Sequence, residues 1–155
     1  MKTAEDILNE KKRDIVWVRK DQSVFDAVQS MVDNAIGAIL IKEGEQYVGI
    51  FTERDLLRNL TTPGFDPKTA IVSDYMSSPL HCAPHDMTLL KLNEKFLGLF
   101  IRHLMIEKQG RQYGMLSIGD VMRASMLEKD QQIKELNEIA SWEYYEDWGW
   151  DRKKR

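Results

Sequence analysis

The chain has 155 residues, 43% of them hydrophobic, so it can bury one core of ordinary domain size or two small cores packed together. Its 22 basic and 25 acidic residues give a net charge of -3, which supplies no overall field to attract nucleic acid or an anionic membrane. The single cysteine, Cys82, excludes an internal disulfide, and the opening MKTAEDILNEKKRD has no apolar stretch of the signal-peptide type, so we expect a cytoplasmic location.

The first half predicts a short helix, a strand, a helix, two strands and a further helix, in that order. AEDIL at residues 4–8 suits the short helix, and IVWV at 15–18 is rich in the β-branched and aromatic residues typical of strands. Ser23 is a good N-cap for an amphipathic helix that continues to residue 34. AIGAILIKE and QYVGIF flank the polar EGE and predict a hairpin, and the next helix begins near Thr52.

The second half repeats this order after a linker, which we place at residues 62–70 because TTPGFDPK contains two prolines and a glycine. VSDYM predicts a short helix, LHCA a strand, TLLKLNEKFLGLF a helix, IRHLMIE and QYGMLS two strands, and the last helix begins at Ser117. Four charged residues interrupt the most apolar segment, residues 87–106, so it lacks the run of about 20 apolar residues that a membrane span needs.

The two halves align with each other at a shift of 65 positions, without a gap from Ile15 to Leu60. This shift places Gly49 on Gly114 and Asp55 on Asp120. We interpret the pattern as a duplication that gives an α+β fold of two strand-helix-strand-strand-helix repeats, residues 1–61 and 71–127, followed by a C-terminal helix and tail at 128–155. A unit of about 60 residues is marginally stable alone, so we expect the repeats to pack face to face with pseudo-twofold symmetry around a cleft.

Each repeat carries the same motif where a strand passes into a helix: GIFTERD in the first and GMLSIGD in the second. Thr or Ser followed three residues later by Asp is close to a capping box, which is the structural interpretation of the motif. The functional interpretation is a nucleoside phosphate site. A helix N-terminus offers free N–H groups and partial positive charge to a phosphate, and an aspartate one turn along can accept hydrogen bonds from ribose hydroxyls.

The halves resemble a tandem pair of CBS domains, also known as a Bateman module. The resemblance rests on IGAILI followed by VGIFTERDLLR, on IRHLMI followed by YGMLSIGDVMRA, and on AEDIL and VSDYM as short introductory helices. It covers residues 3–126 and implies a regulatory protein, not an enzyme, whose clefts bind adenosine-containing ligands such as AMP, ADP, ATP, NAD(H) or S-adenosylmethionine. It implies no covalent cofactor and a homodimer as the usual assembly.

The resemblance also implies roles for individual residues. Asp55 and Asp120 would hold the ribose, with Thr52 and Ser117 near the ribose or phosphate. Apolar residues of the opposite repeat would face the adenine, so Ile36 is expected in the cleft of Asp120 and Ile101 in the cleft of Asp55. Less directly, Val16 and His81 on the first strands would line the pockets through backbone atoms.

Basic residues make the two clefts unequal. Arg102 and His103 begin a strand of the second repeat where the first has Gly37 and Ala38. The family often has this basic pair, which suits a phosphate. Arg54 in the first motif is matched by a glycine in the second; it is either a ligand contact or a solvated helix residue.

Other constellations are weak. HCAPH brings two histidines and a cysteine within five residues, but strand geometry and Pro84 do not gather them, and no second cluster completes four metal ligands. Cys82 has no identifiable base to activate it as a nucleophile, and neither a Walker-type phosphate loop nor an HExxH motif occurs. We therefore expect neither a metal nor catalysis.

The C-terminal segment continues the last helix with an apolar face and then becomes aromatic. Its aromatic residues are Trp142, Tyr144, Tyr145, Trp148 and Trp150. One interpretation is that the helix packs back on its own module or on a dimer mate, and the other is a docking segment for a protein partner through residues 128–155. The alternative to a nucleotide sensor is accordingly a ligand-free interaction scaffold or dimerisation module that acts through this tail.

Overall fold

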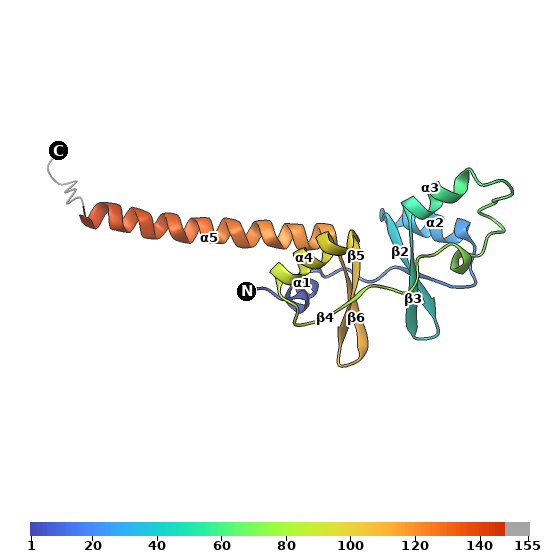
Figure 1. Ribbon diagram of the computed structural model, residues 1–155, viewed down its shortest axis with the longest axis horizontal. Coiled ribbons are helices and arrows are strands. Elements are labelled where there is room, and N and C mark those ends of the chain that lie inside the picture. Colours follow the sequence, from blue (N-terminus) through green and yellow to red (C-terminus); the bar gives the residue numbers. More distant parts are fainter. Residues whose placement is uncertain (148–155) are drawn as a thin grey trace.

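The structure, a computed structural model, describes the backbone of residues 1–147 and the side chains of residues 1–140, and both halves have the predicted order of elements (Figure 1). The first half contains β1 (Trp17–Arg19), α2 (Val24–Asp33), β2 (Ala38–Glu43), β3 (Gln46–Thr52) and α3 (Glu53–Leu60). The second contains β4 (Cys82–Pro84), α4 (Leu89–Leu99), β5 (His103–Lys108), β6 (Arg111–Ser117) and α5 (Ile118–Asp147). The α+β prediction is thus confirmed.

Each half forms a three-stranded sheet with the same topology. The first strand pairs in parallel with the second, which pairs with the third as an antiparallel hairpin. The ladder shifts register after Ile41 in β2 and after Ile106 in β5, two positions that the repeat alignment equates. A bulge is a specific local feature, so its occurrence at equivalent positions supports the duplication.

The two introductory segments are exchanged between the repeats. Helix α1 (Ala4–Lys11) buries Ala4 and Ile7 in the core of the second repeat and lies beside α4 and α5 (Figure 1). The 3-10 helix η1 (Val72–Asp74) places Val72 in the core of the first repeat instead. The sequence-based boundaries, 1–61 and 71–127, follow chain order, whereas each core takes its introductory segment from the other range.

Two equivalent glycines permit this exchange. A Cβ on Gly49 would lie 2.4 Å from the sulfur of Met76, which follows η1, and a Cβ on Gly114 would lie 3.0 Å from both methyl carbons of Leu8 in α1. Both glycines therefore mark places where another segment crosses a strand closely.

A pair of hydrogen bonds between two equivalent residues joins the two hairpins. The backbone N–H of Tyr47 donates to Oε1 of Gln112 at 2.7 Å, and Nε2 of Gln112 donates to the carbonyl of Tyr47 at 2.8 Å. These two residues are equivalent in the repeat alignment, so the pseudo-twofold axis passes between them.

Helix α5 is 30 residues long and extends away from both repeats (Figure 1). Every side chain from residue 131 to 140 is exposed, including Ile133, Leu136 and Ile139, so this part of the helix does not pack back on its own module. The predicted aromatic cluster lies outside the described side chains, and Trp148 and Trp150 lie outside the described residues. Over the described range, no helix has the length and apolar character to cross a membrane.

Candidate ligand-binding clefts

Both motifs form capping boxes. Oδ2 of Asp55 accepts hydrogen bonds from the backbone N–H and the hydroxyl of Thr52, each at 3.0 Å, and the N–H of Asp55 donates to that hydroxyl at 3.3 Å. Asp120 and Ser117 repeat this geometry at 2.8, 2.9 and 3.2 Å. The structural interpretation of the motif is therefore realised at both helix starts, and any ligand contact must use the remaining capacity of the carboxylates.

A cleft of about 450 Å³ opens beside the first motif, and we call it the Asp55 cleft. It is lined by residues of both repeats. The predicted site residues in its lining are Thr52, Arg54, Asp55, His81, Ile101, Arg102 and His103. Ile101 thus lies in the same cleft as Asp55, across the repeat boundary, as expected from the resemblance. Their contact with a ligand stays a prediction.

Asp55 is buried, with 6% of its surface exposed, and it is the one buried charged residue among the side chains that the structure describes. Three arginines and the acidic Glu53 line the cleft around it. Nη1 of Arg58 lies 4.0 Å from Oδ1 of Asp55, and Arg58 also lines the cleft. The sequence analysis assigned Arg58 no role, although the shift of 65 positions equates it with Arg123. Its position one turn beyond the aspartate is the signal that could have identified it.

His103 contributes a group whose charge depends on its surroundings. Burial lowers the pKa of His103 below its ordinary value, and the positive charges of Lys11 and Arg102 lower it further. The imidazole is therefore neutral at pH 7 and can both donate and accept a hydrogen bond. An anion brought into the cleft would raise this pKa again.

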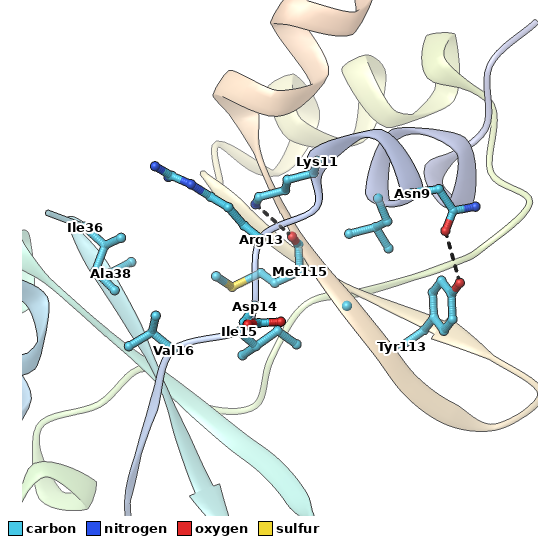
Figure 2. A pocket seen from close by; sticks show the side chains of 12 residues that line it. Asn9, Lys11, Arg13, Asp14, Ile15, Val16, Ile36, Ala38, Tyr113 and Met115 are labelled. Carbon is cyan, nitrogen blue, oxygen red and sulfur yellow. Dashed lines mark hydrogen bonds between the residues drawn. The ribbon is translucent and has the colours of Figure 1, made fainter. Parts of the chain in front are cut away.

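At the second motif the predicted residues lie in separate hollows. Ile36 and Val16 line a hollow of about 340 Å³, shown in Figure 2. Asp120 lines another hollow, of about 450 Å³, together with Arg123. Lys11 lines both hollows and lies at the boundary between them. The expected cleft that joins Ile36 to Asp120 is accordingly divided in this structure.

Lys11 is a wall residue of both hollows, and its ammonium holds Asp120. Its Nζ lies 2.7 Å from Oδ2 of Asp120 and donates to the carbonyl of Met115 at 3.2 Å. Burial alone would raise the pKa of Asp120, but the hydrogen bonds from Lys11 and Ser117 outweigh burial, so this pKa lies below its ordinary value. Lys11 was missed by the sequence interpretation because α1 was assigned to the other repeat.

The residues of HCAPH have other contacts. Nδ1 of His85 lies 2.8 Å from a carboxylate oxygen of Glu5 in α1. Burial raises the pKa of the Cys82 thiol, and Glu107 raises it further, so the thiol is protonated at neutral pH. Within the described residues, no group of three His, Cys, Asp or Glu side chains could hold a metal ion.

Comparison with known proteins identifies the family. A family model for the CBS domain matches the chain twice, over residues 4–62 and 72–127. The chain belongs to the CBS-domain family. Both matched ranges of this CBS-domain pair contain one introductory segment and one capping motif, whereas α5 beyond residue 127 lies outside them.

The relatives agree with this assignment. The CBS pair is 35% identical over 127 residues to the mitochondrial CBS domain-containing protein CBSX3 of Arabidopsis thaliana. The aligned region spans 79% of this chain and 62% of the length of that relative. Among solved structures, the CBS-domain protein ATU1752 from Agrobacterium tumefaciens is 34% identical, with a TM-score of 0.73 over 80% of this chain and 99% of its own. PAE2072 from Pyrobaculum aerophilum, complexed with AMP, is 22% identical, with a TM-score of 0.70 over 82% and 97%, and shares the fold.

Proposed function

We propose that this CBS-domain pair is a regulatory module that binds an adenosine-containing ligand, such as AMP, ADP, ATP, NAD(H) or S-adenosylmethionine, in the Asp55 cleft. The observation that carries the proposal is the convergence of seven predicted site residues on one cleft formed by both repeats. Its volume of about 450 Å³ falls within the usual range of about 300 to 1,000 Å³ for small-molecule sites.

Each part of such a ligand has a chemical counterpart in the cleft. The Asp55 carboxylate can accept hydrogen bonds from ribose hydroxyls, and Ile101 offers an apolar contact for adenine. Arg54 and Arg102 can pair with phosphate oxygens. The AMP held by the Pyrobaculum fold neighbour is a ligand of this chemical class and supports the proposal.

Binding across two repeats suggests a regulatory, non-catalytic role. A ligand that contacts both sides of the cleft stabilises the relative arrangement of the repeats that fits it best, and it shifts that equilibrium by its difference in affinity between arrangements. A homodimer would pass the change on to a partner. The cytoplasmic location stays a prediction from the sequence.

The test is calorimetric titration of the full chain with AMP, ATP, NADH and S-adenosylmethionine, repeated with Asp55→Asn. Asn keeps an acceptor for Thr52 but loses the charge that binds ribose hydroxyls, so we expect affinity to fall about tenfold or more. The matched control is Asp6→Asn, because Asp6 forms the same capping box with Thr3 in α1. Equal loss in both variants, or binding by none of the four ligands to folded protein, would overturn the proposal.

A second candidate, an interaction scaffold, is favoured by α5. Ile133, Leu136 and Ile139 are more than half exposed, on a helix segment whose side chains from residue 131 to 140 are all exposed. Sedimentation of the full chain and of Leu136→Glu separates the candidates. A scaffold or dimer built on α5 loses association in the variant while ligand affinity in the Asp55 cleft is unchanged. Association that is equal in both proteins counts against this candidate.

A further inference from the structure

The ammonium of Lys11, a residue of the same chain, is hydrogen-bonded to the aspartate of the second motif. Oδ2 of Asp120 accepts from Nζ of Lys11 at 2.7 Å, from the N–H of Ser117 at 2.8 Å and from its hydroxyl at 2.9 Å. Lys11 and Asp120 each have 23% of their side-chain surface exposed, so this ion pair is half-buried and is screened less than a surface pair. The position that ribose hydroxyls would take on this oxygen is already filled.

Asp55 is different although its capping geometry is the same. Its Oδ2 accepts from Thr52 alone, and the nearest cationic nitrogen, Nη1 of Arg58, lies 4.0 Å from the other oxygen. The Arg58 side chain is 68% exposed and can move at little cost. The first carboxylate is therefore available to a ligand, whereas the second is neutralised by a cation of the same chain.

The place of Lys11 decides what can enter the second cleft. It lines both hollows and its ammonium is bound to Oδ2 of Asp120, so a ligand that reached from Ile36 to this oxygen would have to displace the ammonium. Figure 2 shows Ile36 and Val16 on one side of the first hollow and Lys11 bonded to Met115 on the other. An uncharged nucleoside would leave the displaced ammonium with a single carbonyl partner, and an unpaired half-buried charge is unfavourable.

A phosphate would give the displaced ammonium a new partner. Arg13 also lines both hollows, and Arg123 lines the one that contains Asp120. Lys11, Arg13 and Arg123 could then form charge-assisted hydrogen bonds with phosphate oxygens while the ribose takes over Asp120. The same cation that excludes a nucleoside therefore favours a nucleotide.

We propose that Lys11 is a resident counter-ion that closes the second cleft to uncharged nucleosides and admits ligands that carry a phosphate. The Asp55 cleft, without such a cation on its aspartate, takes both kinds of ligand. This inference rests on the proposed function, because it assumes that the two aspartate motifs bind ribose. It makes Lys11, from α1, the residue that determines the ligand specificity of the second cleft.

The experiment is an NMR titration of the full chain labelled with ¹³C in its isoleucine methyl groups. Ile101 reports the Asp55 cleft and Ile36 the second cleft. Adenosine should shift Ile101 alone in the wild type, whereas AMP should shift both. In Lys11→Met, adenosine should also shift Ile36, with an affinity at the second cleft about tenfold or more above that of the wild type.

Lys12→Met is the matched control, because it removes an equal charge one residue away on an exposed side chain. Lys11→Arg keeps the cation, and both variants should behave as the wild type does. The wild-type comparison of adenosine with AMP needs no variant, so the inference can be tested even if Lys11→Met does not fold.

Three results would overturn the inference while Ile101 still responds. They are adenosine shifting Ile36 of the wild type at the same concentration as Ile101, AMP failing to shift Ile36, and Lys11→Met leaving Ile36 unresponsive to adenosine. If Ile101 responds to neither ligand in any variant, the proposed function fails, and this inference fails with it.

Discussion

The exchange of introductory segments predicts which repeat a substitution in α1 destabilises. Chain order alone would predict the first repeat, whereas the structure predicts the second. Ile7 lies in the first sequence range but is buried in the second core, with 4% of its surface exposed. Replacing a buried isoleucine by alanine costs about 2 to 5 kcal/mol of folding free energy, a large part of the roughly 5 to 15 kcal/mol that stabilises a domain. We expect Ile7→Ala to destabilise the second repeat and to leave the first largely unchanged.

Native-state hydrogen exchange measures this directly, because it reports the opening free energy of each strand. A loss of about 2 kcal/mol or more corresponds to a fall of about 30-fold or more in the protection of β5 amides, with little change in β2. The mirror variant, Val72→Ala, should lower protection in β2 instead, because Val72 is buried in the first core. Equal losses in β2 and β5 for Ile7→Ala would refute the reasoning that the two cores open separately.

Three further predictions concern other parts of the chain. Gly49→Ala places a Cβ 2.4 Å from the Met76 sulfur and should cost about 1 to 3 kcal/mol in urea denaturation. His103 has a lowered pKa and is neutral at pH 7, and a phosphate in the adjoining cleft favours its protonated form. A phosphate monoester also takes up a proton in this range, since its second pKa is about 6, so the effect of His103 is the difference from His103→Gln. The ratio of wild-type to His103→Gln affinity for AMP, measured by calorimetry, should rise as the pH falls from about 7.5 to 6. Glu5 has its pKa lowered mainly by a hydrogen bond from Lys108, so its contribution to stability is present above its ordinary pKa of 4.5 and is lost as the pH falls below that value. Glu5→Gln should therefore show a smaller loss of thermal stability in acid than the wild type.

Each of these three predictions has a control variant or a result that would contradict it. Gly119→Ala adds a Cβ whose nearest neighbour is 3.6 Å away, so it should be neutral or slightly stabilising; a loss equal to that of Gly49→Ala would contradict the crowding argument. A ratio of wild-type to His103→Gln affinity that stays constant between about pH 7.5 and 6 would show that His103 does not gain a proton on binding. Identical acid profiles for wild type and Glu5→Gln would show that the carboxylate of Glu5 does not stabilise the packing of α1.

Much of the fold could be predicted from local pattern. The shift of 65 positions, the alternating hydrophobic runs and the Thr52 and Ser117 caps gave the order of all ten repeat elements, because period and capping are local properties of the chain. The convergence of Ile101 and Asp55 on one cleft came from the family resemblance, since periodicity shows which face of an element is buried but not which element covers it.

The sequence by itself determined two similar repeats and two capped helix starts, each with an aspartate in its first turn. The tertiary structure decided which core contains α1. It thereby decided that Lys11 of α1 pairs with Asp120. Lys11 is far from Asp120 along the chain, and its 2.7 Å contact exists because α1 crosses to the second repeat over Gly114. An exchange of this kind leaves the local hydrophobic pattern of α1 unchanged, so the difference between an open aspartate and an occupied one appears only when the two repeats are packed together.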